Sequence, residues 1–149
     1  MSGMSESVMS GSATHRSGGL RDLGLLVGRI VMVSLFLPAG IGKITGWPGI
    51  VHYLAYLHAP VPFLAGIVAI VCEVGVSTLI VLGIGVRLSA LVMAAFTLGT
   101  MFIAHRFWDL HGAAMMAAKM NFFKNLSIVG GFLVMASAGS GRYALRPDG

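Results

Sequence analysis

The chain has 149 residues, of which 56% are hydrophobic and only 10% are charged, and its mean hydropathy is +0.89. Soluble domains carry about 25% charged residues, so this composition excludes an ordinary water-soluble globule and indicates a protein whose solvent is lipid. The net charge of +5 comes from basic residues at the ends of apolar runs and in short loops, which fits contact with lipid headgroups and argues against nucleic-acid binding. The length predicts one folded domain.

The first residues form a tail rich in Ser, Gly and Met, without hydrophobic periodicity. This composition buries too little apolar surface to fold alone, so we expect a disordered tail over residues 1–19 and a membrane domain over residues 20–149. Arg16 and Arg21 precede an apolar run, as in a signal peptide. That run, residues 23–41, is longer than the roughly 7–15 residues of a signal peptide's apolar region and predicts an uncleaved first span.

The first predicted span contains two cations, Arg29 within it and Lys43 at its end. A period of 3.6 residues places both on one helical face with Phe36 and Gly40. Pro38 lacks a backbone N–H and should kink this helix near its outer end.

The remaining elements follow from the apolar runs and the turns between them: a short amphipathic helix over residues 49–57, a second span over residues 61–82, a tight turn over residues 83–87, a third span over residues 87–107, a polar loop over residues 109–119 and a fourth span over residues 120–138. At about 1.5 Å per residue, each span covers the roughly 30 Å hydrocarbon core. The sequence therefore predicts an all-α fold, a four-transmembrane-helix bundle with a short interfacial helix after the first span.

An even number of spans places both termini on the same side of the membrane. That side would hold five cations, Arg16, Arg21, Arg87, Arg142 and Arg146, and the other side four, Lys43, Arg106, Lys119 and Lys124. The positive-inside rule therefore favours a cytoplasmic location for both termini, by five cations to four.

Glu73 lies near the middle of the second span, where a carboxylate is costly and needs a partner or a wet cavity. Counting from the cytoplasmic ends of the helices places Arg29 about eight residues deep and Glu73 about ten, a difference of about 3 Å. An arginine–carboxylate pair is the cheapest way to hold both charges in lipid. We therefore predict that Arg29 and Glu73 interact, either as a structural staple or as part of a binding site.

A second polar group gathers toward the outer side, where the first and third spans end and the fourth begins: Lys43, His105, Asn121, Lys124 and Asn125. Together with Arg29 and Glu73, these residues form the candidate ligand-binding site. A basic, hydrogen-bonding layer above an internal ion pair can hold an anionic or carbonyl-bearing headgroup while a lipid-like tail enters the bundle. The alternative is that Lys43 and Lys124 only extend toward the membrane interface.

The sequence has no recognisable metal or catalytic signature. The spacings His52–His58 and His105–His111 match no good metal-site pattern, and no Ser–His–Asp or Cys–His arrangement stands out. The single cysteine, Cys72, excludes an intrachain disulfide. We predict no metal site and leave enzymatic activity open.

Several short motifs follow one another along the chain in a specific order: Gly40-Ile41-Gly42-Lys43, Pro60 with Pro62, Glu73, Leu82-Gly83 with Arg87, Phe96-Thr97, His105-Arg106-Phe107-Trp108, Met120-Asn121-Phe122-Phe123-Lys124-Asn125-Leu126, Gly130-Gly131 and Gly139-Ser140-Gly141-Arg142-Tyr143. Their order and spacing over residues 20–146 resemble the DoxX family of small bacterial membrane proteins. The resemblance implies a four-helix integral protein of the bacterial cell membrane. The family takes its name from a subunit associated with thiosulfate:quinone oxidoreductase, so the resemblance also implies a link to redox systems.

Three functions are compatible with these features. The first is a membrane subunit of a quinone-linked redox system, with a quinone near Glu73, Lys43, His105 and Lys124 and a redox protein as partner. The second is a non-catalytic membrane scaffold or assembly partner, in which the polar residues hold the bundle together. The third, a small-solute carrier, is the weakest, because the four short spans contain no internal repeat. The oligomeric state stays open.

Overall fold

The structure is a computed structural model that describes the backbone of residues 4–148 and the side chains of residues 18–148. Its elements are, in chain order, α1 (Met4–Val33), α2 (Phe36–Thr45), α3 (Gly49–Tyr56), α4 (Pro62–Ile70), a π-helical segment η1 (Val71–Val76), α5 (Ser77–Leu82), α6 (Val86–Ala104), a 3-10 turn η2 (Phe107–Asp109) and α7 (Gly112–Ala138). The predicted disordered tail, residues 1–19, falls almost entirely on residues whose side chains are not described, and it stays a prediction.

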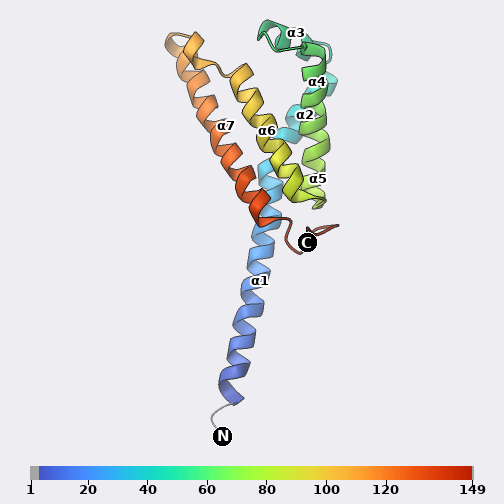
Figure 1. The fold of residues 1–149 in the computed structure, drawn as a ribbon, viewed down its shortest axis with the longest axis vertical. Coiled ribbons are helices and arrows are strands. Elements are labelled where there is room, and N and C mark those ends of the chain that lie inside the picture. Colours follow the sequence, from blue (N-terminus) through green and yellow to red (C-terminus); the bar gives the residue numbers. More distant parts are fainter. Residues whose placement is uncertain (1–3, 149) are drawn as a thin grey trace.

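Three helical stretches within the described residues are long and apolar enough to cross a membrane: Gly18–Thr45, Pro62–Leu82 and Val86–Asp109. The fourth long helix, α7, packs along α6 (Figure 1). Its polar residues, Lys119, Asn121, Lys124 and Asn125, make it less apolar than the other three. The predicted all-α architecture, four long helices with a short helix after the first, is confirmed.

The first span is broken between α1 and α2, near the predicted kink. A proline ring clashes with the carbonyl four residues earlier, which for Pro38 is the carbonyl of Ser34. The helix accordingly stops at Val33 and resumes at Phe36. The Ser34 hydroxyl donates to the Val31 carbonyl at 2.7 Å, so the break is stabilised locally.

The second span contains an irregularity that could not be predicted from its sequence. Pro62 lies in the first turn of α4, where its missing N–H costs nothing. The helix then widens into η1, which carries Glu73, before it continues as α5. Turns of π-helix are rare and occur frequently at functional sites. Gly83, with φ of +76°, ends α5 in the left-handed conformation that favours glycine.

The long helices diverge into two arms (Figure 1). We call α2, α3 and α4 the first arm and α6 with α7 the second arm. They are joined at a closed end by a core whose most buried members include Val33, Ile80, Val86, Met93 and Phe132. Phe36 of α2 and Phe132 of α7 meet there with ring centroids 5.6 Å apart. Beyond this contact the arms separate, which leaves an open end near α3 and η2.

The predicted polar loop over residues 109–119 is wrong for most of its length, because α7 begins at Gly112. Four alanines lie in residues 113–118, and alanine has the highest intrinsic helix propensity. The fourth long helix is therefore longer than expected at its N-terminal end.

Candidate functional site: a cavity between the two arms

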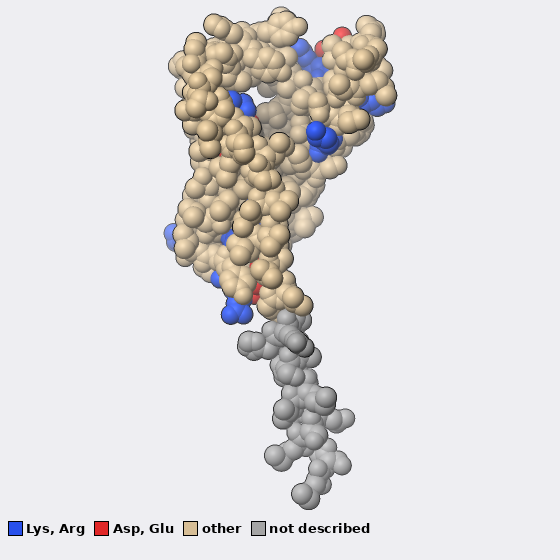
Figure 2. Space-filling model, turned by 180° about the vertical axis from the view of Figure 1, so that it is seen from behind, with Lys and Arg blue, Asp and Glu red and all other residues tan. Residues whose placement is uncertain are grey.

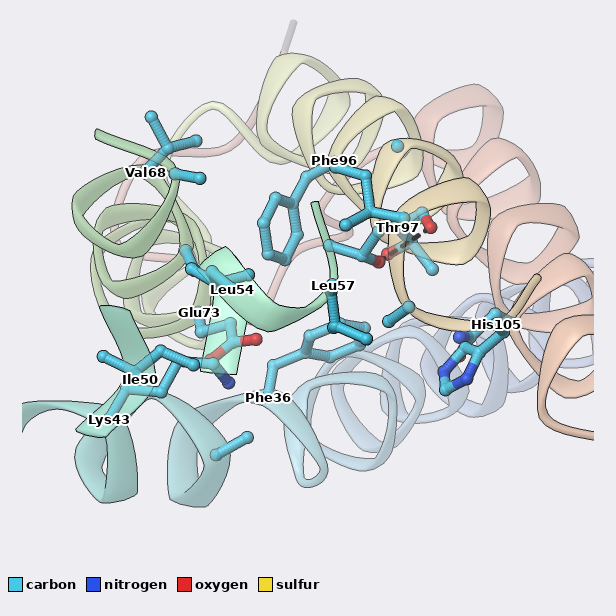
Figure 3. A pocket seen from close by; sticks show the side chains of 18 of the residues that line it. Phe36, Lys43, Ile50, Leu54, Leu57, Val68, Glu73, Phe96, Thr97 and His105 are labelled. Atoms are coloured by element: carbon cyan, nitrogen blue, oxygen red, sulfur yellow. Dashed lines mark hydrogen bonds and ion pairs between the residues drawn. The ribbon is translucent and has the colours of Figure 1, made fainter. Parts of the chain in front are cut away.

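A cavity of about 490 Å³ lies between the arms at the open end. Residues of α2, α3, α4, η1 and α6 line it, with a single contribution from α7. Most of its wall is apolar, and Phe36, Leu54, Leu57 and Phe96 face its interior (Figure 3). From behind, the molecule is hollowed between the arms, with cations on both sides of the hollow (Figure 2). The volume lies in the range of roughly 300–1,000 Å³ that is typical of small-molecule sites.

An ion pair forms one wall of this cavity. The Lys43 Nζ lies 2.6 Å from the Glu73 Oε2, and the two side chains are 24% and 9% exposed. Gly40, one turn before Lys43, makes this contact possible. A Cβ at Gly40 would lie 2.8 Å from the Glu73 Cβ and 2.6 Å from the Val74 Cγ2, so only glycine lets α2 approach η1 this closely.

The predicted pairing of Arg29 with Glu73 is wrong. Arg29 is 1% exposed, and its Nη2 donates to the carbonyl of Tyr143 at the closed end. Its Nη1 lies against Gly83, in the turn after α5. The depth count assumed that the first span begins level with the end of the second. Because α1 extends past the bundle, Arg29 is itself level with that end. The predicted depth of Arg29 was therefore too large by about 12 Å, the length of eight residues of helix.

The second arm contributes His105, at the end of α6, and Asn125 of α7 to the cavity wall. Lys43 with Glu73 and His105 lie at two ends of the cavity, with apolar side chains between them (Figure 3). Thr97 of α6 also lines the cavity. It is 1% exposed, and its hydroxyl has no hydrogen-bond partner among the described residues.

The structure thus brings together four of the seven residues predicted for the site: Lys43, Glu73, His105 and Asn125. Arg29, Asn121 and Lys124 are not part of the cavity wall. The Lys124 Nζ instead donates to the Asn121 Oδ1 at 3.2 Å, on the exposed side of α7.

Sequence reasoning missed Thr97 and the contribution of α3. Ile50 and Leu54 lie within this short helix and Leu57 just past its end, and all three line the cavity. Their i, i+4, i+7 spacing was visible as the apolar face of the predicted interfacial helix. Nothing in the sequence indicated that this face would cover a cavity.

A single arginine closes the outer edge of the site. The Arg106 Nη2 donates to the Leu57 carbonyl at 3.2 Å, which links the end of the second arm to the corner between α3 and α4. Its Nε also lies 3.4 Å from the Asp109 Oδ2. A smaller cavity of about 260 Å³ lies beside this bridge and shares Leu57, Ile103 and Ala104 with the larger one.

The arrangement has a definite chemical character. The charges of Lys43 and Glu73 cancel, so their wall of the cavity carries no net charge. An ammonium group has three N–H donors, and Lys43 uses one on Glu73, which leaves two for another acceptor. The cavity can therefore hold a neutral, largely apolar molecule that accepts hydrogen bonds at its ends.

The fold and its cavity are those of a multi-pass, all-α membrane protein. The profile of the DoxX family matches residues 24–106. The chain is 44% identical over 128 residues to inner membrane protein YphA of Escherichia coli strain K12, covering 86% of this chain and 91% of YphA. It is 40% identical over 126 residues to inner membrane protein YqjF of the same strain, covering 85% of this chain and 92% of YqjF. No solved structure gives a significant match.

These matches span nearly the whole folded part of the chain. The chain therefore belongs to the DoxX family, as a multi-pass protein of the bacterial inner membrane.

Proposed function

We propose that this protein is a membrane subunit of a quinone-linked redox system and that its cavity holds the quinone. The observation that carries the proposal is the Lys43–Glu73 ion pair, which lies in the wall of an apolar cavity of about 490 Å³. A carboxylate in a membrane span is costly, and such residues face partners or cavities that serve a function. An ion pair that lines free space with unused donors goes beyond what a structural staple requires.

Charge balance favours a neutral ligand. An anion or a cation would lose its hydration on entry and would find no uncompensated opposite charge beside the paired Lys43 and Glu73. Carbonyl oxygens are neutral acceptors, and the cavity offers donors at both ends, from Lys43 at one and from His105 at the other, with Asn125 as a further donor in its wall. A flat ring with carbonyl groups on opposite sides matches this pattern.

A bound quinone would supply a redox couple that takes up two electrons and two protons, the electrons coming from a partner redox protein. The residues of this chain would bind the ring and handle the protons. The Lys43 Nζ can give a proton to a carbonyl oxygen beside it, and Glu73, hydrogen-bonded to the same nitrogen, can take up a proton from water and pass it to the neutral amine that is left. His105 is positioned to do the same at the other end.

The binding test compares two asparagines on one helix. Asn125 lines the cavity, whereas Asn121, one turn earlier on α7, does not. Thermal melting of the detergent-purified protein is measured against a soluble short-chain benzoquinone. We expect saturable stabilisation of the wild type, an affinity about fivefold weaker in Asn125→Ala, from the loss of about 1 kcal/mol of hydrogen bonding, and no change in Asn121→Ala.

Mass spectrometry of the gently purified complex completes the test, and we expect it to find a quinone. If the wild type contains none and benzoquinone does not change its melting, the proposal is wrong. Recovery of a stable protein partner, without quinone, would then support the scaffold function instead.

We also propose that both termini face the cytoplasm. Arg87, Arg142 and Arg146 lie at the closed end, where they contact Asp148, Asp22 and Ile84, and Arg21 is next to Asp22 in the chain; positive charge favours the cytoplasmic side. Fusions of green fluorescent protein and of alkaline phosphatase to the C-terminus should give fluorescence and no phosphatase activity. The reverse result would invert the orientation.

A further inference from the structure

The C-terminal segment, residues 139–148, leaves α7 and folds against the closed end of the bundle without crossing it (Figure 1). The Leu145 N–H donates to the Leu82 carbonyl at 2.9 Å, and the Arg87 N–H donates to the Asp148 Oδ2 at 3.2 Å. These bonds attach the segment to the two ends of the turn between α5 and α6. The segment therefore has a fixed place at the ends of the spans.

The first helix fixes the same segment from the other side. The buried guanidinium of Arg29 donates to the Tyr143 carbonyl. The Arg142 N–H donates to the Asp22 Oδ1 at 3.3 Å, and the Arg142 guanidinium lies 3.8 Å from the Asp22 Oδ2. Because the Arg29 Nη1 lies against Gly83, in the turn that joins the second and third predicted spans, this contact holds the C-terminal segment level with the ends of those two spans.

The exposed side chains of the segment combine two kinds of chemistry. Arg142 and Arg146 are both exposed, and between them Leu145 is 73% and Tyr143 47% exposed. The Arg142 guanidinium also lies 5.7 Å from the centroid of the Tyr143 ring. Exposed apolar side chains flanked by basic ones are costly to display to water, but they suit the boundary between headgroups and acyl chains, where tyrosine is enriched.

The closed end also carries an excess of positive charge. Asp22 and Asp148 are the described carboxylates there, and both already accept hydrogen bonds from the protein. Figure 2 shows cations at this end of the molecule, next to the start of the grey tail. Fixed position, exposed apolar side chains and positive charge thus coincide at the ends of the predicted spans.

We propose that the C-terminal segment is a binding surface for the headgroups of anionic phospholipids, with Arg142 and Arg146 contacting phosphate and with Tyr143 and Leu145 inserted among the acyl chains. Because the segment is held by backbone hydrogen bonds before lipid arrives, little ordering is required on binding. The surface is separate from the cavity, and the proposal does not depend on the quinone.

The test measures lipid preference on the full chain in mild detergent. Short-chain phosphatidylglycerol and phosphatidylcholine are titrated separately, and bound lipid is counted by native mass spectrometry. We expect the wild type to prefer phosphatidylglycerol. Arg146→Gln should lower that preference about fivefold, and Arg142→Gln combined with Arg146→Gln by up to about 25-fold, since each basic residue near an anionic surface contributes on the order of a fivefold affinity.

Lys119→Gln is the matched control, because it removes one exposed cation from α7 beyond the other end of the spans. It should keep the wild-type preference. Unchanged melting in phosphatidylcholine verifies that each variant is folded. The proposal is wrong if the wild type binds both lipids equally, if the double variant keeps the preference, or if Lys119→Gln loses as much as Arg146→Gln. Equal competition by inorganic phosphate would also overturn it, since it would identify a simple anion site.

Discussion

The two ends of the bundle each contain a partly or fully buried cation, and the contrast between them separates structural from functional burial. At the closed end, Arg29 is 1% exposed and is surrounded by backbone, with the Tyr143 carbonyl as acceptor and Gly83 against its guanidinium. At the open end, Lys43 is 24% exposed, faces a carboxylate and borders about 490 Å³ of cavity. Arg29 is packed against backbone, whereas Lys43 borders a cavity.

The difference follows from how the helices approach each other. At the closed end the arms are in contact through Phe36 and Phe132, and at Gly83 no side chain larger than hydrogen fits beside Arg29. At the open end the arms diverge, and only the close approach of Gly40 to η1 brings Lys43 to Glu73. A buried charge is therefore a good indicator of function only where free volume accompanies it, since Arg29 also has donors, Nε and Nη1, without a partner among the described residues.

Breaking the ion pair at the open end should have the largest effect. Glu73→Gln leaves the ammonium of Lys43 without its counter-charge in a largely apolar wall, and we expect a loss of about 3 kcal/mol in the free energy of unfolding. The measurement is reversible unfolding in mixed micelles. Lys43→Gln combined with Glu73→Gln removes both charges and should recover part of that loss. If the double variant is as unstable as the sum of the single variants, the two side chains are not coupled.

The corresponding change at the closed end should act locally. Arg29→Met removes the donor to the Tyr143 carbonyl, so the opening free energy of the C-terminal segment should fall by about 2 kcal/mol, the worth of a hydrogen bond to a charged group. Hydrogen exchange of residues 139–148 should then be about 30-fold faster. Binding of benzoquinone at the open end should stay at the wild-type level. Equal weakening of both ends would contradict the separation of structural and functional cations.

Some features of the two ends could be predicted from the sequence and others could not, and the reasons are physical. The second span and its neighbours were predictable because helices in lipid must satisfy their own backbone groups, which requires long apolar runs. The need of Glu73 for a partner was predictable from the cost of its charge. The partner itself was not, since Lys43 and Arg29 both lie on the expected face of the first span, and only the start of α1 relative to the bundle decides between them.

The position and extent of the cavity could not be predicted from the sequence. It exists because the two arms separate beyond Phe36 and Phe132, and a pattern of apolar residues does not report where packing stops. Four polar residues of the candidate site were nevertheless identified, since each is expensive in a membrane span or at its end. Thr97 was missed because a single threonine in a helix can bond to its own backbone and raises no such cost.

A larger side chain at Gly40, where α2 approaches η1, should have an intermediate effect on stability. Gly40→Ala places a Cβ 2.6–2.8 Å from side-chain atoms of Val74 and Glu73, so α2 must move outward and lengthen the ion pair. We expect a loss of about 1.5 kcal/mol, as for other overpacked sites. Gly42→Ala, on the same helix, has open space around its Cβ and should be neutral or slightly stabilising. The comparison uses thermal melting, and equal melting of the two variants would contradict close packing at Gly40.

The hydrogen bond between Arg106 and Leu57, at the edge of the cavity, should contribute least to stability, but it should affect ligand entry to the cavity most directly. The Arg106 side chain is 36% exposed, and its hydrogen bond to the Leu57 carbonyl links the arms where little else does. Arg106→Gln should therefore cost about 1 kcal/mol or less in the free energy of unfolding. Because the arms would open more easily, both association and dissociation of benzoquinone should accelerate, with little change in affinity. Stopped-flow kinetics distinguish this from a role in binding, since loss of a direct contact would raise the dissociation rate alone.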